Sequence, residues 1–183
     1  MLMVIPVISI VGKSKSGKTT LIEKLIPELH QRGYRVGTVK HHFHPDFEID
    51  KPGKDTWRHA QAGSVHVILA APDKIATIRQ LKEELSLDEI VTEILITRSR
   101  KYPQLDLILV EGFKNAGKPA LEIVRAERST DLICDIEQLI GIVSDIDLNI
   151  PKPQFGLNDT HQITDFLIEY IQKISLVHRF SIL

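Results

Sequence analysis

The hydrophobic positions of the chain fall into short β-branched runs separated by longer stretches of helical period. A run of four to eight apolar, β-branched residues bounded by turn signals is typical of a buried strand. Six segments fit this description and are predicted as strands: Val4–Val11, Tyr34–Lys40, Ser64–Ala71, Leu105–Gly112, ALEIVRA at 120–126 and QLIGIVSD at 138–145.

Five segments between and after these runs have the period of a helix. They are Lys18–Arg32, DTWRHAQAG at 55–63, IATIRQLKEEL at 75–85, SLDEIVTEILITRSRK at 86–101 and Thr160–Leu176. Gly33 suits the left-handed residue that closes a helix, whereas Pro27 should kink or break the first helix. In the last helix, one apolar stripe predicts a packing face, and its N-cap is Asp159 or Thr160; the stripe consists of Ile163, Leu167, Tyr170, Ile171 and Ile174.

The alternation of strands and helices predicts an α/β fold. It indicates a mainly parallel sheet flanked by helices in three layers, with the functional site at the carboxyl ends of the strands. With 183 residues and 43% hydrophobic residues, the chain is long enough for one buried core. We therefore expect residues 1–183 to form a single domain.

Composition narrows the function classes. A net charge of −1 gives no bulk electrostatic reason to expect a nucleic-acid or membrane partner. The single cysteine, Cys134, excludes an intramolecular disulfide and fits a reducing cytosol. The apolar stretch MLMVIPVISIV is too short to span a bilayer and lacks the flanks of a signal peptide, so we interpret it as a buried strand.

The stretch GKSKSGKT, Gly12–Thr19, matches the phosphate-binding loop GxxxxGK[ST]. It follows a predicted strand and opens a predicted helix, which is the context that the motif requires. Backbone N–H groups of such a loop surround phosphate oxygens, and the helix N-terminus adds a positive dipole. The nucleotide-binding residues predicted here are Gly12, Lys13, Ser14, Lys15, Ser16, Gly17, Lys18, Thr19 and Thr20.

Individual roles follow from this motif. Lys18 should reach the β and γ phosphates, Thr19 should bind Mg²⁺, and Thr20 could contact the α-phosphate. Glu111 ends the apolar strand LDLILVEG, where a carboxylate beside the loop can bind Mg²⁺ or polarise water. Asp106 begins the same strand, at the opposite end from the site, and is expected at the surface.

The second lysine of the loop, Lys13, resembles the deviant phosphate loop of the SIMIBI class of P-loop proteins. In that class, this lysine can reach a nucleotide across a dimer interface. The alternative is a solvated lysine that only adds positive potential near the phosphates.

The segment Lys40–Gly63 is dense in charged and imidazole groups. Lys40, His41, Lys54 and Arg58 are donors that suit an anionic ligand. A zinc site is the alternative, with His41, His42 and His44 as ligands. However, neither spaced cysteines nor an HxxxH pair support a closed tetrahedral site.

Three segments together resemble the MobB family of molybdopterin-guanine dinucleotide biosynthesis proteins: GKSKSGKTTLIEKLI, TVKHHFHPDFEIDKPGKDTWRHAQAG and LILVEGFK. The resemblance implies a GTP-binding protein of the SIMIBI class with weak GTPase activity. It implies a homodimer that assists a guanylyltransferase in attaching GMP to molybdopterin. Asp50 and Asp55 would then serve Mg²⁺ or switch contacts, and the basic groups around them could meet the phosphate of molybdopterin.

The chain has no intact NKxD motif for guanine. A carboxylate after a buried strand can accept both N–H groups of the Watson–Crick edge of guanine, so such a residue would select the base. The segment VSDID offers Asp145 and Asp147, and we favour Asp145.

Two other functions fit parts of the pattern. In a small-molecule P-loop kinase, the segment from Lys40 to Arg58 would hold the acceptor, and Arg98 and Arg100 would close over the phosphates. A nickel metallochaperone GTPase would use the histidines, but it needs thiolates or a His-rich tail that this sequence does not show.

Overall fold

The computed structural model describes residues 5–43, 47–96, 104–114 and 116–180, with the backbone alone for 175–180. The chain forms two compact units: one joins the residues up to His41 with those from Val91 onward, and the other is His42–Ile90. The single-domain organisation expected from the length stays a prediction. Val4, His44, Arg98 and Arg100, which entered the sequence predictions, lie outside the described residues.

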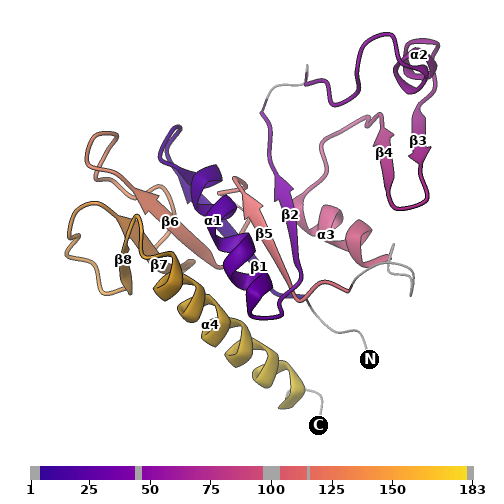
Figure 1. Ribbon diagram of the computed structural model, residues 1–183. Helices are drawn as coiled ribbons and strands as arrows, with labels where there is room; N and C mark the ends of the chain where they lie inside the picture. The colour runs from indigo at the N-terminus through magenta and orange to yellow at the C-terminus, as the bar shows by residue number, and fades with distance from the viewer. Residues whose placement is uncertain (1–4, 44–46, 97–103, 115, 181–183) are drawn as a thin grey trace. The chain divides into compact units, whose positions relative to one another are not determined.

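The larger unit is built on a six-stranded sheet with the order β2-β5-β1-β6-β7-β8 (Figure 1). Every strand pair in this sheet is parallel, as the alternating pattern predicted. Its strands are β1 (Val7–Gly12), β2 (Val36–Lys40), β5 (Leu107–Glu111), β6 (Ala120–Val124), β7 (Leu139–Ser144) and β8 (Gln154–Gly156).

Two helices, α1 (Lys18–Gln31) and α4 (Thr160–Phe180), pack together on one face of this sheet (Figure 1). They bury the alternate strand residues that point toward them. The predicted stripe of α4 supplies Ile163, Leu167 and Ile171 to this core. The core also contains Ile8, Ile10, Leu21, Ile22, Leu25, Leu29, Leu107, Leu109, Leu121, Ile123 and Val143.

Irregular segments cover part of the other face. Val11, Leu139 and Ile142 pack there with Cys134, which is a buried apolar filler as expected. Glu122 of β6 is buried on this side and accepts the backbone N–H groups of Ile133 (2.7 Å) and Cys134 (3.1 Å). Burial raises the pKa of Glu122, and these two donors oppose the rise. The carboxylate thus fastens the segment after β6 to the sheet.

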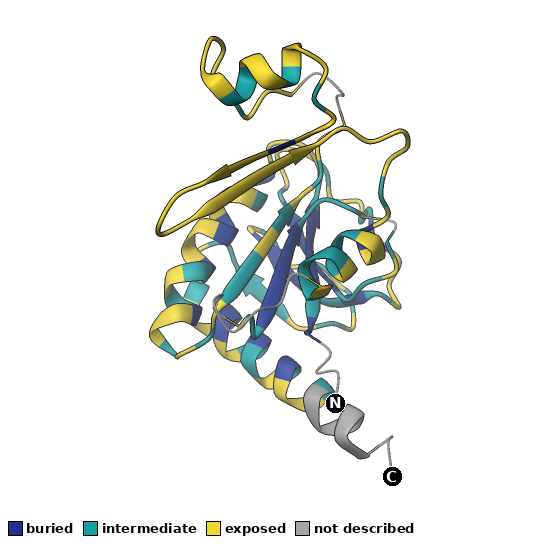
Figure 2. Cartoon of the chain, turned by 90° about the vertical axis from the view of Figure 1, so that its right-hand side faces the viewer, coloured by how far each residue is buried: buried dark blue, intermediate teal, exposed yellow. Residues whose placement is uncertain are grey.

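The smaller unit contains α2 (Asp55–Gln61) and the antiparallel hairpin of β3 (His66–Ala70) and β4 (Ile75–Arg79). The helix α3 (Leu87–Ile96) carries the chain from this unit to the larger one. Figure 2 shows that the hairpin is exposed along nearly its whole length, whereas the central strands of the large sheet are buried.

Two predictions of secondary structure need correction, and one short strand was missed. The segment at 75–85 is not a helix, because Ile75–Arg79 forms β4 and no helix follows before Leu87. The helix α1 continues through Pro27, which excludes the break, and the alternative of a kink stays a prediction. Glu23, whose carbonyl loses its usual N–H partner to this proline, is exposed, and water can hydrate that oxygen. The short strand β8 was not predicted.

Candidate phosphate-binding site

The loop between β1 and α1 adopts a backbone that only glycine can take at its first position. Gly12 has φ 147°, and a methyl group there would lie 2.6 Å from the carbonyl oxygen of Ile123 and 2.7 Å from Oγ of Ser16. Gly17 (φ 101°) and Lys15 (φ 62°) are also left-handed. These positive φ angles let the backbone form a tight loop just before the N-terminus of α1, as a phosphate-binding loop requires.

Lys18, the first residue of α1, folds back over this loop. Its Nζ donates to the carbonyl oxygens of Gly12 (3.0 Å) and Lys13 (2.9 Å). Burial lowers the pKa of Lys18, the positive charge of Lys40 lowers it further, and Glu111 opposes both effects. Phosphate oxygens would offer this ammonium charged acceptors in place of neutral carbonyls.

Glu111 joins three elements at the carboxyl edge of the sheet. Oγ1 of Thr19 lies 3.0 Å from both carboxylate oxygens of Glu111. Lys40, at the end of β2, places Nζ 2.7 Å from Oε1 of the same carboxylate. The structure therefore brings Thr19 and Glu111 together beside the loop, although they are far apart in the sequence.

This pair fits the requirements of Mg²⁺. A hydroxyl and a carboxylate are hard oxygen ligands, and Mg²⁺ in nucleotide sites is held by one or two such groups plus phosphates. Thr19 and Glu111 would hold the ion, and the ion would neutralise phosphate charge. Asp50 and Asp55, the other predicted magnesium residues, lie in the smaller unit, where Asp50 accepts the N–H of Lys51 (2.8 Å). Their part in this site stays a prediction.

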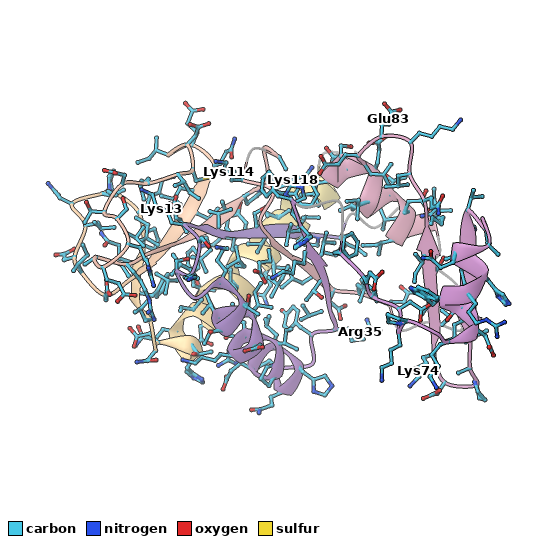
Figure 3. All side chains as sticks on the ribbon, turned by 90° about the horizontal axis from the view of Figure 1, so that it is seen from above. Lys13, Arg35, Lys74, Glu83, Lys114 and Lys118 are labelled. Atoms are coloured by element: carbon cyan, nitrogen blue, oxygen red, sulfur yellow. The ribbon has the colours of Figure 1, made fainter. Side chains whose placement is uncertain are left out.

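Lys13 follows the first loop glycine and lies 3.8 Å from Oδ2 of Asp131 (Figure 3 labels Lys13). Both side chains are substantially exposed, so the ion pair contributes little to stability. Lys13 is therefore accessible at the surface, and its proposed reach across a dimer interface stays a prediction.

The predicted anion site draws on both units. Lys40 and His41 belong to the larger unit, and His41 packs on Phe113 with ring centroids 4.3 Å apart. Lys54 is the N-cap of α2, Asp55 is its first residue and Arg58 lies in its last turn, all in the smaller unit. Their joint binding of one anion stays a prediction. Among the described residues, no group of histidine, cysteine and acidic side chains could hold a metal ion by itself.

The two candidate base readers lie just after β7, and both are exposed. Oδ1 of Asp145 accepts the backbone N–H of Ala126 at 2.9 Å, so this carboxylate connects the ends of β6 and β7. Asp147 lies two residues further along. Recognition of guanine by either residue stays a prediction.

Arg125 is the residue at this edge that the sequence analysis did not select. It follows β6 directly, and a methyl group on Gly17 would lie 3.9 Å from its Nη2. An arginine at the end of a strand is not a motif. Only the pairing of β6 with β1 places it beside the phosphate loop.

The parallel sheet, the glycine loop and the Thr19–Glu111 pair define a P-loop nucleotide-binding protein. The family model for molybdopterin guanine dinucleotide synthesis protein B (MobB) matches residues 7–145. The chain belongs to this family.

Curated relatives support the same assignment. The chain is 37% identical over 172 residues to the molybdopterin-guanine dinucleotide biosynthesis adapter protein of Escherichia coli, covering 92% of this chain and 95% of the relative. The Haemophilus influenzae protein of the same name is 38% identical over 167 residues, with 91% and 90% covered.

A solved structure agrees with the fold. The crystal structure of molybdopterin-guanine biosynthesis protein B (mobB) superposes with a TM-score of 0.71 at 30% identity. The alignment covers 91% of this chain and 99% of that one. None of the helices in the described part of the chain combines the length and hydropathy that crossing a bilayer requires.

Proposed function

We propose that this protein is a GTP-binding adapter with weak GTPase activity that assists a guanylyltransferase in attaching GMP to molybdopterin. The observation that carries the proposal is the family match across the phosphate loop and Glu111, combined with the contact between Thr19 and Glu111. The names of the relatives support the pathway. Lys18 binds the outer phosphates, and Thr19 with Glu111 holds Mg²⁺.

The side chains at the carboxyl edge of the sheet support the proposed adapter role. The described edge supplies groups that bind phosphates and Mg²⁺, namely Lys18, Thr19, Glu111 and Lys40. Glu111, the carboxylate expected to polarise water, is already bonded to two donors. Slow hydrolysis agrees with this arrangement, because a carboxylate committed to a metal is a poor general base. Molybdopterin would be held by the basic groups from Lys40 to Arg58.

The first test compares GTP and ATP binding in the presence of Mg²⁺. We expect a preference for GTP. Lys18→Ala should weaken GTP binding about 50-fold, since charge-assisted hydrogen bonds to phosphate contribute about 2–3 kcal/mol. Calorimetric titration of both proteins measures this. A preference for ATP would contradict the assignment and favour the small-molecule kinase.

The partner is tested separately. A guanylyltransferase of the same pathway, mixed with this protein and GTP, should form a complex detectable by light scattering and should make molybdopterin guanine dinucleotide faster. Lys18→Ala serves as the matched control, because it removes the nucleotide contact at a position away from the sheet core. An unchanged rate of product formation with the wild-type protein would contradict the adapter role.

A further inference from the structure

Arg125 lies on the opposite side of the phosphate loop from Glu111. The strand β1, which leads into the loop, has β5 on one side and β6 on the other. Gly12 is paired with Ile123 of β6, so Arg125 emerges two residues beyond the level at which the loop begins. Its Nη2 would contact a methyl group placed on Gly17, at 3.9 Å. The guanidinium is therefore adjacent to the N-terminus of α1.

The guanidinium has little of its hydrogen-bonding capacity satisfied by the protein. Its Nη1 lies 3.6 Å from Oε1 of Glu127, which is beyond hydrogen-bond distance. Its Nε is buried and has no hydrogen-bond partner among the residues that the structure describes. Roughly a third of the side chain is exposed. An arginine with a buried, unsatisfied Nε–H group beside a phosphate cradle suits an anionic ligand.

The backbone around Arg125 is fixed by several contacts. The next residue, Ala126, donates its N–H to Asp145 at 2.9 Å. The carbonyl of Arg125 accepts the N–H groups of Arg128 (2.9 Å) and Ser129 (3.0 Å), which closes a turn. Since both sides of the peptide chain at this point are bonded, the backbone of Arg125 is already fixed, and only its side chain would lose entropy on binding.

The groups on the two sides of the phosphate loop differ, and this difference would orient the phosphate chain of a nucleotide. On the β5 side, Thr19, Glu111 and Lys40 form the metal-binding end, where the terminal phosphate belongs. On the β6 side, Arg125 lies beside Gly17, away from that cluster. A phosphate chain laid across the loop therefore presents its inner phosphates toward Arg125.

We propose that Arg125 binds the inner phosphates of the nucleotide, those that GDP and GTP share, and fixes the orientation of the phosphate chain in the loop. This inference rests on the proposed nucleotide-binding function and adds a residue and a direction to it. A planar guanidinium can donate two parallel hydrogen bonds to one phosphate group, whereas a lysine acts as a point charge.

The test titrates GTP and GDP, each with Mg²⁺, into wild type, Arg125→Gln and Arg125→Lys. Arg128→Gln is the matched control, because Arg128 lies in the same turn, and its Nε is also 3.6 Å from Glu127. We expect Arg125→Gln to weaken GTP and GDP by the same factor, about 20-fold, from the loss of one charge-assisted contact. Arg125→Lys should recover part of the loss, and Arg128→Gln should bind like wild type.

Each other outcome has a definite meaning. If Arg125→Gln binds both nucleotides like wild type, the inference fails while the proposed function stands. Loss of GTP binding alone would move Arg125 to the terminal phosphate and overturn the stated direction. If wild type binds neither nucleotide, the proposed function itself fails. If Arg125→Gln has a lower melting temperature than wild type, its binding data alone do not separate lost contact from lost folding, and Arg125→Lys decides. Full wild-type affinity of Arg125→Lys for both nucleotides would mean that a positive charge suffices and would overturn the guanidinium contact.

Discussion

Glu111 is the residue that would hold Mg²⁺ together with Thr19. It accepts from Thr19 and pairs with Lys40, and its side chain is mostly buried while that of Lys40 is mostly exposed. An ammonium 2.7 Å from a carboxylate supplies the positive charge that Mg²⁺ would otherwise provide. We predict that Mg²⁺ bound together with a nucleotide would compete with Lys40 for this carboxylate, which would free the ammonium to donate to the terminal phosphate.

This exchange predicts a change in nucleotide preference. Lys40→Met should weaken GTP binding about tenfold more than GDP binding, because only GTP carries the phosphate that the ammonium would reach. Titration of both nucleotides with Mg²⁺ gives the ratio of dissociation constants. Lys114→Met is the matched control, an exposed lysine on the loop after β5 (labelled in Figure 3). An equal loss for GTP and GDP would contradict a role at the terminal phosphate.

A single site residue could be predicted from the sequence when its role depended only on its neighbours along the chain. Lys18 and Thr19 belong to a contiguous motif, so the sequence sufficed for them. Glu111 was found because a carboxylate at the end of an apolar strand is a recognisable pattern, and its contact with Thr19 confirms their proximity. Arg125 was missed because its position beside the phosphate loop depends on the pairing of β6 with β1, which no local sequence pattern predicts.

Elements were predictable where one periodicity dominated. The buried strands β1, β5, β6 and β7 have the apolar runs typical of a parallel sheet. The helix expected at 75–85 was wrong because Leu81, Lys82 and the acidic residues after them favour a helix, whereas the cross-strand pairing of Ile75–Arg79 with β3 determined the structure. Three residues of β8 were too few to give a pattern.

The pair of β2 and β5 is stabilised at its amino end by an ion pair that gives a pH prediction. Arg35 contacts Asp106 through Nε (2.8 Å), Nη2 (3.0 Å) and its backbone N–H (2.9 Å). The side-chain hydrogen bonds from Arg35 lower the pKa of Asp106 below its usual value of 3.8. The folded state therefore prefers the ionised carboxylate, and this stabilisation is present above the usual pKa and lost as the pH falls through the lowered one.

Asp106→Asn should therefore lower the melting temperature by a few degrees at neutral pH, since the pair is partly exposed and screened. The difference from wild type should shrink as the pH falls below the usual carboxyl pKa of 3.8 and through the lowered pKa of Asp106, because protonation removes the ionised form that Arg35 stabilises. Thermal unfolding followed by circular dichroism at several pH values measures both effects. Asp73→Asn, in the exposed turn between β3 and β4, is the control. A difference that stays constant with pH would contradict the assignment.

At the scale of the whole molecule, the smaller unit has a sheet too small to be stable by itself. A two-stranded hairpin is marginal in water unless a hydrophobic face is covered. Ile68 and Ile75 lie on the same face, because Ile68 pairs with Thr77 and Ile75 with Ala70, and they are 54% and 51% exposed. The resemblance to the family implies a homodimer, and we predict that a second copy of the chain covers this face.

The dimer is tested by the double variant Ile68→Thr/Ile75→Thr. Threonine keeps the branched shape and strand propensity of isoleucine, so the hairpin should persist while its apolar face is lost. Each isoleucine is about half exposed, so covering it contributes about 0.8–1 kcal/mol, and a symmetric dimer contains four of them. The dissociation constant of the dimer should therefore rise by at least 100-fold, roughly 3 kcal/mol in total. Sedimentation velocity over a concentration series measures this. Ile136→Thr is the control, because Ile136 is 47% exposed but lies in the larger unit. A wild-type monomer would contradict the homodimer, and an unchanged dimer in the double variant would place its interface on another surface.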